Sequence, residues 1–560
     1  MKPNFDFMPR LFTEIKSYNK EKFAADSMAG LIVGIVALPL AIAFGIASGV
    51  SPDKGMITAI IGGLIVSLLG GTKIQIGGPT GAFIVIVYGI IQKFGFGGLA
   101  ISTIMAGAML LIMGFLKLGT VVKFIPYPII VGFTAGIAVT IFTTQVNDLL
   151  GLSLKDMPGD FIEKWGLYFL NIHKISIISL IFSALSILLI VITPKISKKI
   201  PGSLVAILVV TLISYVLKNQ FNVQGIVTIG DNYPDLSASI SFSGFDIPGI
   251  DQINELLPSA FTIAILGAIE SLLSATVADG IIGDKHDSNT ELIAQGAANV
   301  IVPFFGGIPV TGAIARTMTN INNGGKTPVA GIIHAVVLLL IMFFLIPLAK
   351  HIPMACLAGV LAVVSYNMSG WRTFRSLLKN SKSDVTVLVI TFVLTVIFDL
   401  TIAIGFGMLF AMLLFMRRVS EVTKVSVSTN ELDLSQESEI SHNEEKISLK
   451  PGIEVYEIDG PFFFGVANKF DEMMSVLGTS KPKVRIIRMR KVPFMDTTGL
   501  HNLESLYRLS INNNIPIVLS GVNEKVRKVL QASELCNKIG EINICDHISK
   551  AITRAESFVD

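Results

Sequence analysis

Long apolar stretches, separated by short polar ones, fill most of the chain up to about residue 416. A hydrocarbon core about 30 Å thick needs about 20 apolar helical residues to cross it. Six stretches reach or approach that length: 29–50, 98–118, 128–146, 175–193, 260–278 and 328–348. Eight shorter ones lie between or after them: 56–69, 81–91, 204–217, 293–305, 312–321, 355–368, 385–398 and 401–416. The pattern predicts an α-helical polytopic membrane protein with about fourteen transmembrane segments.

The pattern changes after the last apolar stretch, and this divides the chain into regions. We expect a polar N-terminal tail at 1–24, a transmembrane domain at 25–418 and a polar linker at 419–450. In the remaining region, 451–560, strand patterns at 453–458, 484–488 and 515–519 alternate with helical patterns at 466–477, 498–508 and 524–530. Such alternation predicts a separate α/β domain.

Charge agrees with this division and excludes several classes of protein. Only 15% of the residues are charged, against about 25% in soluble proteins, and a net charge of +3 is too small to indicate a nucleic-acid partner. Basic clusters follow the sixth, twelfth and fourteenth segments, so the positive-inside rule predicts a cell-membrane protein with both termini in the cytoplasm. The cysteines lack metal-ligand spacing, and there is no P-loop or nucleophile elbow. We therefore expect no metal, no cofactor and no enzymatic activity.

An internal repeat lies within the membrane region. The stretch GGPTGAF at 77–83 resembles GGIPVTGAI at 306–314, and KFIP at 123–126 recurs as KHIP at 350–353 at nearly the same offset. Each half then holds seven segments. Because seven is odd, the second half must enter the membrane from the opposite side, which is typical of inverted-repeat transporters.

The repeated stretches predict a binding site for an anion. Pro and Gly prevent an ordinary spanning helix there, so we expect two half-helices that begin near Thr80 and near Thr311-Gly312. Their N-termini, each with about half a positive charge, would meet at the midplane. Arg316 lies about one turn into the second half-helix and adds a cation. The alternatives are tight turns at the membrane surface and, for Arg316, an ion pair with a carboxylate.

Glu270 is a carboxylate in the middle of the eighth segment, and Ser274 follows it on the same helix face. A carboxylate away from water must be paired or protonated. This suits a proton relay, or a sodium ligand shared with Ser274. A pair with Arg316 is the alternative, and both arrangements are compatible in different states.

At these residues the chain resembles the SulP family of anion transporters, and the resemblance covers nearly the whole chain. The family includes bacterial sulfate, bicarbonate and dicarboxylate carriers and animal exchangers such as prestin and pendrin. The stretches that carry the resemblance are GAIESLLS at 267–274 with VAD at 277–279, PVTGAIAR at 309–316, and residues 38–44. In the C-terminal domain, GPFFFGVAN at 460–468 resembles the strand-to-helix entry of a STAS domain.

The resemblance implies seven plus seven inverted segments in a core domain and a gate domain, a homodimer, and an elevator-like movement. Relatives bind the anion between the third and tenth half-helices, beside the first and eighth segments. The matching positions here are Phe44, Thr80, Ala315 and Arg316. Leu40 stands where animal members often carry glutamine, which removes a side-chain donor and weakens any close analogy of substrate.

The resemblance leaves the coupling ion open. In some bacterial relatives the acid of the eighth segment is linked to protons, whereas in bicarbonate carriers a carboxylate and a hydroxyl at the same places bind sodium. Glu270 and Ser274 fit either role. We favour proton-coupled transport of a small anion of the sulfate, bicarbonate or C4-dicarboxylate class. Sodium-coupled bicarbonate symport, an exchanger or channel of the same fold, and a signalling scaffold are the alternatives.

The C-terminal domain holds one candidate regulatory site. Related STAS domains have an Asp-Ser-x-Gly loop whose serine is phosphorylated, and the stretch DTTG at 496–499 places Thr497 at that position. A phosphate would add about −1.5 to −2 charge and could switch a contact with a cytoplasmic regulator. The alternative is an ordinary helix cap, because Asp and Thr are common N-cap residues.

Overall fold

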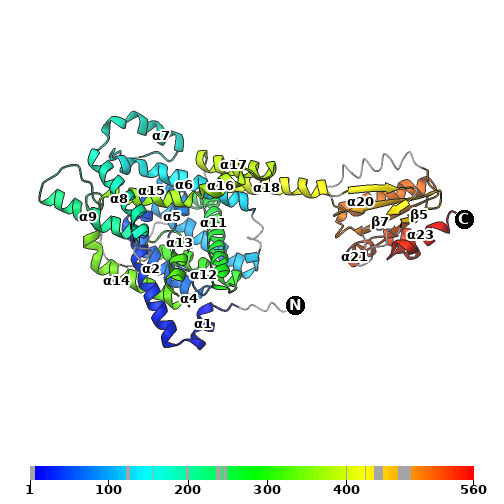
Figure 1. The fold of residues 1–560 in the computed structure, drawn as a ribbon, viewed down its shortest axis with the longest axis horizontal. Helices are drawn as coiled ribbons and strands as arrows, with labels where there is room; N and C mark the ends of the chain where they lie inside the picture. The colour runs from blue at the N-terminus through cyan, green and yellow to red at the C-terminus, as the bar shows by residue number, and fades with distance from the viewer. Residues whose placement is uncertain are drawn as a thin grey trace. The chain divides into compact units, whose positions relative to one another are not determined.

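The computed structural model describes residues 7–120, 126–154, 157–196, 201–234, 240, 242, 244, 249–398, 400–422, 424–429, 431–433, 446–463 and 481–560. It divides into two compact units, Met1–Leu409 and Phe410–Asp560. The first is built of helices, and the second contains a five-stranded sheet (Figure 1).

The helices of the membrane region follow the predicted apolar segments. In the first half they are α2 (Lys20–Ala47), α3 (Pro52–Ile57), α4 (Gly63–Leu69), α5 (Ile84–Phe115), α6 (Tyr127–Leu150), α8 (Ile177–Ile196) and α9 (Gly202–Asn219). In the second half they are α11 (Ile250–Ile282), α12 (Ser288–Ile301), α13 (Ile314–Asn322), α14 (Val329–Ala349), α15 (Met354–Met368), α17 (Lys382–Ile397) and α18 (Leu400–Val422). The predicted polytopic helical fold is confirmed.

Two of the predicted short segments correspond to an interrupted helix, α5, and to a short one, α13. Within the described residues, nine helical spans are long and apolar enough to cross a membrane. One of them, Gly81–Phe115, contains the predicted segment 81–91 and most of 98–118. Gly95, with φ 65° and ψ −170°, interrupts the helix between these two segments. That backbone conformation is open mainly to glycine. Helix α13 has only 9 residues and is too short to span a membrane alone.

The helices pack in two groups that each draw on both halves of the sequence. In the first group α2 packs against α14, and α5 packs against α11 and α12. In the second, α6 packs against α15 and α17, and α8 packs against α9 and α15. Helices far apart in the sequence therefore lie side by side, as Figure 1 shows for α5, α11 and α12. This division matches the predicted core and gate.

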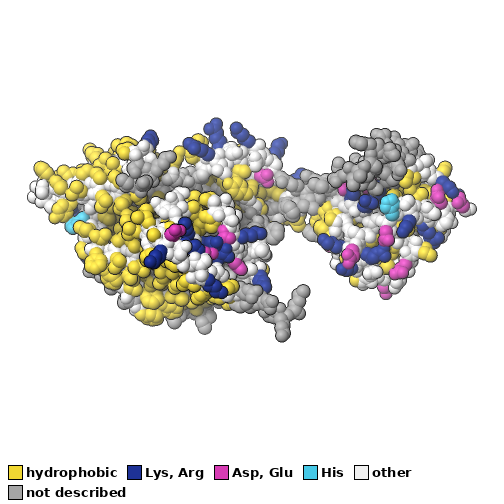
Figure 2. All heavy atoms as spheres, turned by 60° about the horizontal axis from the view of Figure 1, so that its bottom comes forward, with side chains coloured by type: hydrophobic (Ala, Val, Ile, Leu, Met, Phe, Trp, Pro, Cys, Tyr) yellow, Lys and Arg dark blue, Asp and Glu magenta, His cyan; other side chains and the backbone are white. Residues whose placement is uncertain are grey.

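Large apolar side chains remain exposed on the first unit, as expected for a surface that contacts lipid. Examples are Leu208, Leu212, Phe344 and Leu348, with exposed fractions of 61%, 65%, 75% and 62%. Figure 2 shows hydrophobic side chains over much of the visible face of this unit, with a group of charged side chains near its centre and further Lys and Arg side chains along its upper edge. A protein in water would rarely expose so large an apolar surface.

A charged cluster holds the short helix α1 (Arg10–Glu14) against the rest of the first unit, within the range expected to be a tail. Asp284 lies 2.7 Å from Arg10 and 2.9 Å from Lys73, and Lys73 lies 3.2 Å from Glu14. Burial opposes ionisation of Asp284, but hydrogen bonds from Lys73 and Arg10 outweigh it and lower its pKa to about 2. The cluster joins the chain before α2, the loop after α4 and the end of α11.

We expect Asp284→Asn to loosen α1 without unfolding the protein. The pKa of Asp284 is lowered from 3.8 to about 2. The ionised carboxylate therefore stabilises the folded protein fully above pH 3.8, and this stabilisation is lost as the pH falls through about 2. At neutral pH the two partly exposed pairs contribute about 0.5 kcal/mol each, or about 1 kcal/mol together. Limited proteolysis near α1 should therefore become about fivefold faster. Glu534→Gln, which removes a pair between neighbours on one helix turn, is the control, and equal proteolysis of both variants would contradict the anchoring role.

The second unit is the predicted α/β domain. Its sheet has the order β3-β6-β7-β8-β9, formed by β3 (Lys424–Ser428), β6 (Ile453–Asp459), β7 (Val484–Lys491), β8 (Ile517–Ser520) and β9 (Ile544–Cys545). Strands β6 to β9 run parallel, whereas β3 is antiparallel to β6. Helices α20 (Thr497–Asn512), α21 (Glu524–Gln531), α22 (Leu535–Ile539) and α23 (Ile548–Glu556) accompany them.

The range 419–450 was expected to be a linker, yet it contains β3, which pairs with β6 along its whole length. It also contains β4 (Glu431–Asp433) and β5 (Lys446–Ser448), which form a hairpin. The three strands have 5, 3 and 3 residues, so they are too short to give a clear strand pattern in a polar sequence. The helix expected at 466–477 lies outside the described residues, as do residues 464–468 of the proposed strand-to-helix entry.

Candidate anion site

The two repeated stretches meet as a short antiparallel bridge. Strand β1 (Gly77–Gly78) pairs with β2 (Thr311–Gly312), with Gly77 opposite Gly312 and Gly78 opposite Thr311. A helix starts directly after each strand: a 3-10 turn at Gly81–Phe83 leads into α5, and α13 begins at Ile314. The bridge therefore brings two helix N-termini together.

The start of α13 supplies backbone donors beside this bridge. The first N–H groups of a helix have no acceptor within it and carry partial positive charge. In α13 these belong to Ile314, Ala315 and Arg316. Ile314 is 37% exposed and Ala315 is exposed, so the N-terminus is open rather than covered. Thr80, which precedes the first helix, is half-buried. These features suit an anion.

Thr311 and Gly312 build the bridge, and their own donors are already used. The Thr311 hydroxyl donates to the carbonyl of Gly267 at 3.0 Å and lies 2.7 Å from the hydroxyl of Ser271. The Gly312 N–H donates to the same Ser271 oxygen at 3.0 Å. Ser271 thus links β2 to α11. The sequence did not indicate this role for Ser271. Its only sequence signal is its place next to Glu270.

Arg316 lies beneath the first strand. Its side chain is 2% exposed, and its guanidinium donates to the carbonyls of Gly77, at 3.5 Å, and Pro79. A side chain at Gly78, where φ is 151°, would overlap the guanidinium. Among the described residues no carboxylate lies within 4.0 Å of Arg316. The ion pair with Glu270 considered from sequence is therefore absent from this structure, because backbone carbonyls take the guanidinium instead.

Glu270 and Ser274 contact different half-helices. The Glu270 carboxylate accepts a hydrogen bond from the Thr80 hydroxyl at 2.9 Å. Ser274, one turn further along α11, donates to the hydroxyl of Thr317 in α13 at 3.3 Å. Thr317 also accepts from the N–H of Ile76 at 3.1 Å. Helix α11 thus links both half-helices, and in this structure Ser274 is directed to Thr317.

Apolar side chains from both helix groups surround the first half-helix. Phe44 of α2 is 5% exposed, and its ring lies 3.7 Å from the position that a Cβ atom on Gly81 would occupy. Ile141 of α6 and Met368 of α15 lie 3.3 Å from the same position. The sequence analysis identified Phe44 but not Ile141 or Met368, because both lie in uniformly apolar segments.

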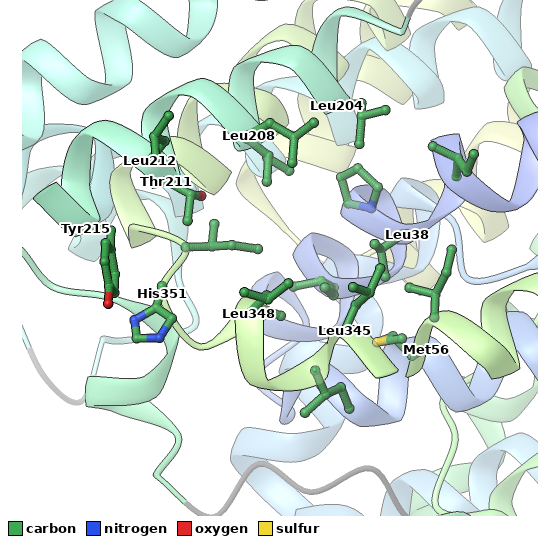
Figure 3. Close-up of a pocket in the computed structure, with 18 residues that line it drawn as sticks. Leu38, Met56, Leu204, Leu208, Thr211, Leu212, Tyr215, Leu345, Leu348 and His351 are labelled. Carbon is green, nitrogen blue, oxygen red and sulfur yellow. The ribbon is translucent and has the colours of Figure 1, made fainter. Parts of the chain in front are cut away.

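A separate apolar cavity of about 510 Å³ lies between α2, α9 and α14. Its lining has few polar side chains: Thr211, Tyr215 and His351. Figure 3 shows Tyr215 and His351 at one end, away from Leu38 and Met56. None of the predicted site residues lines this cavity, and its apolar walls do not suit an anion.

Comparison with known proteins identifies the family. The model of the sulfate permease family matches residues 23–391, and that of the STAS domain matches residues 446–551. The chain belongs to the sulfate permease family. Membership makes it an anion transporter of the membrane rather than an enzyme, and it confirms the resemblance of both domains.

Among relatives of this sulfate permease family member, a putative sulfate transporter of Bacillus subtilis, YvdB, is 39% identical over 538 residues, covering 96% of this chain and 99% of the relative. The bicarbonate transporter BicA of Picosynechococcus is 29% identical over 532 residues, covering 92% and 91%. The solved transmembrane domain of a cyanobacterial BicA has 30% identity and a TM-score of 0.63, covering 69% of this chain and 99% of that domain. The inward-facing murine Slc26a9 anion transporter has a TM-score of 0.86 at 19% identity, covering 98% and 94%, and supports the fold alone.

Proposed function

We propose that this permease is a secondary active transporter of a small oxyanion of the sulfate, bicarbonate or C4-dicarboxylate class, driven by protons. The observation that carries the proposal is the β1–β2 bridge, which joins two helix N-termini above the buried Arg316. Aligned peptide dipoles and a guanidinium together favour a negative ligand without any metal. The names of the relatives, a putative sulfate transporter and a bicarbonate transporter, agree with that class.

The packing supports an elevator-like mechanism. The proposed binding residues Phe44, Thr80, Ala315 and Arg316, and the coupling residue Glu270, all belong to elements of the α2–α5–α11–α14 group or to α13, which packs against α2 and α11. Helices α6 and α15 of the other group place the apolar side chains of Ile141 and Met368 against Gly81 of the first half-helix. A rigid group that carries the site past an apolar surface would move the anion across the bilayer. A homodimer in the cell membrane, with both termini in the cytoplasm, completes the proposal.

Uptake by reconstituted protein tests the function directly. Labelled sulfate, bicarbonate and fumarate would be supplied separately to proteoliposomes, with the pH gradient and the sodium gradient varied one at a time. We expect concentrative uptake of one anion when the pH gradient is imposed alone. Dependence on sodium would favour the bicarbonate symporter, and uptake indifferent to both gradients would leave an exchanger or channel. Absence of uptake of every anion by folded protein would contradict the proposal.

We expect the C-terminal domain to tune transport without forming the pathway. All proposed binding residues precede Leu400, and a BicA transmembrane domain of similar fold was solved by itself. Deletion of residues 424–560 removes β3 together with the sheet that it joins. The deleted protein should keep its anion affinity within about threefold while its rate or expression changes. Complete loss of binding by well-folded truncated protein would contradict this.

Thr497 stays a candidate for phosphorylation by its position. It is exposed at the first turn of α20, where Asp496 caps the helix by accepting the N–H of Gly499 at 2.8 Å. The cap fits the structural alternative. A phosphate there would sit at a helix N-terminus, where negative charge is favoured, and would alter the surface offered to a cytoplasmic regulator.

A further inference from the structure

A fully buried carboxylate lies behind the anion site, on a helix that contributes no proposed binding residue. Glu291 in α12 is 0% exposed. One oxygen accepts from the Gly71 N–H at 3.0 Å and the Thr72 hydroxyl at 3.2 Å. The other accepts from the side-chain amides of Gln75 and Gln295, both at 2.9 Å. Four donors thus converge on one carboxylate.

These contacts suit an ionised carboxylate. An ionised carboxylate accepts about four hydrogen bonds and donates none, and Glu291 accepts four here. All four partners are neutral, and no Lys or Arg lies within 4.0 Å of Glu291 among the described residues. The four hydrogen bonds supply the partners that a buried carboxylate requires.

The partners of Glu291 lead directly into the anion site. Gly71, Thr72 and Gln75 belong to the segment that ends in β1. The Gln75 amide lies against Gly312 of β2, so closely that a Cβ atom on Gly312 would overlap it. Glu291 is thus linked to both strands of the bridge, to β1 through the chain and to β2 through Gln75.

The same segment is held from α13 on its other side. Asn320 donates to the carbonyl of Ile74 at 2.8 Å, and Thr317 accepts the N–H of Ile76 at 3.1 Å. The segment therefore lies between α12 and α13. Glu291 holds it from one side, and Asn320 and Thr317 hold it from the other.

We propose that Glu291 is a positioning residue for anion binding, acting through Gln75 and the segment before β1. The inference rests on the proposed function and extends it to α12. If Glu291 loses its acceptor role, the bridge shifts relative to the donors of α13. Because such a shift misplaces binding groups by a fraction of an ångström, the affinity for the anion should fall more than the maximal rate.

Glu291→Gln tests this, because it keeps the shape of the side chain and replaces an acceptor oxygen by a donor. We expect the KM for the anion that the wild type transports to rise at least tenfold, with a maximal rate per folded transporter within about twofold of wild type. The double variant Gln75→Glu with Glu291→Gln restores a carboxylate–amide pair in reverse and should bring the KM back to within about threefold. Thr103→Val is the control, because this buried hydroxyl donates only to its own helix, at Leu99.

An unchanged KM in Glu291→Gln, or a double variant no better than the single one, would overturn the proposal. If Glu291→Gln does not fold, Gln75→Met serves instead, since it keeps most of the volume and removes only the amide, and an unchanged KM would again overturn the inference. A wild type that transports no anion would refute the proposed function instead, so the two failures are distinguishable.

Discussion

Arg316→Ala is expected to weaken anion binding by roughly a hundredfold, with little loss of folded protein. Removal of a charged contact from a site shielded from water typically costs a few kcal/mol. Arg316 is 2% exposed and has no carboxylate partner within 4.0 Å among the described residues. Its charge is therefore balanced only by the carbonyls of Gly77 and Pro79. An anion at the two helix N-termini would supply the missing negative charge.

Arg316→Lys separates the effect of the positive charge from the support that the guanidinium gives to β1. Lysine keeps the charge but loses the planar fork that reaches two carbonyls. If the electric field dominates, the lysine variant should retain more affinity than the alanine variant. If the support of β1 dominates, both should bind poorly. Equilibrium binding of the labelled anion to purified protein is the measurement, and Arg372→Ala, at an exposed arginine of α16 (Trp371–Leu377), is the control. Normal affinity in Arg316→Ala, at matched expression, would contradict the anion site.

Glu270→Gln is expected to abolish coupling to protons while leaving anion binding within about threefold. Glu270 accepts a hydrogen bond from Thr80 at the start of the first half-helix. An anion bound there would bring a second negative charge close to the carboxylate. A proton on Glu270 removes that repulsion, so anion and proton would bind together. Glutamine imitates the protonated carboxyl permanently.

The size of the effect follows from the driving force. One unit of pH is worth about 1.4 kcal/mol, so one coupled proton supports about tenfold accumulation of the anion per unit of gradient. Glu270→Gln should reduce this accumulation to none. Glu255→Gln, on the same helix but exposed and paired with Lys93 at 3.0 Å, should behave as wild type. Undiminished proton-driven accumulation in Glu270→Gln would refute this role.

If sodium is the coupling ion, different results are expected for variants in the same helix, α11. In that case Glu270→Gln and Ser274→Ala should both remove the dependence on sodium. Ser274 donates its hydroxyl proton to Thr317, which leaves the lone pairs of its oxygen available to a sodium ion. Loss of sodium dependence in both variants, with no response to pH, would establish sodium as the coupling ion.

The membrane fold could be predicted from the sequence because the signals are local. A stretch long enough to span the bilayer must be apolar and helical wherever it lies. Gly and Pro around Thr80 and Thr311 predicted the two interrupted helices, which begin at Gly81 and Ile314. The same local reasoning missed β3: Lys424–Ser428 alternates valine with serine, but so short a run within a polar region gives a weak signal until it pairs with β6.

The partners of the charged residues depended on the tertiary structure. Glu270 and Arg316 were plausible partners in sequence, yet Glu270 bonds Thr80, 190 positions away, and Arg316 bonds carbonyls of the first strand. The sequence predicted no special role for Glu291, because an acidic residue in the first turn of a helix is common. Its four donors come together only when the segment before β1 packs against α12. Residue types and apolar length are properties of the chain, whereas the partner of a buried charge is set by which distant segments fold against it.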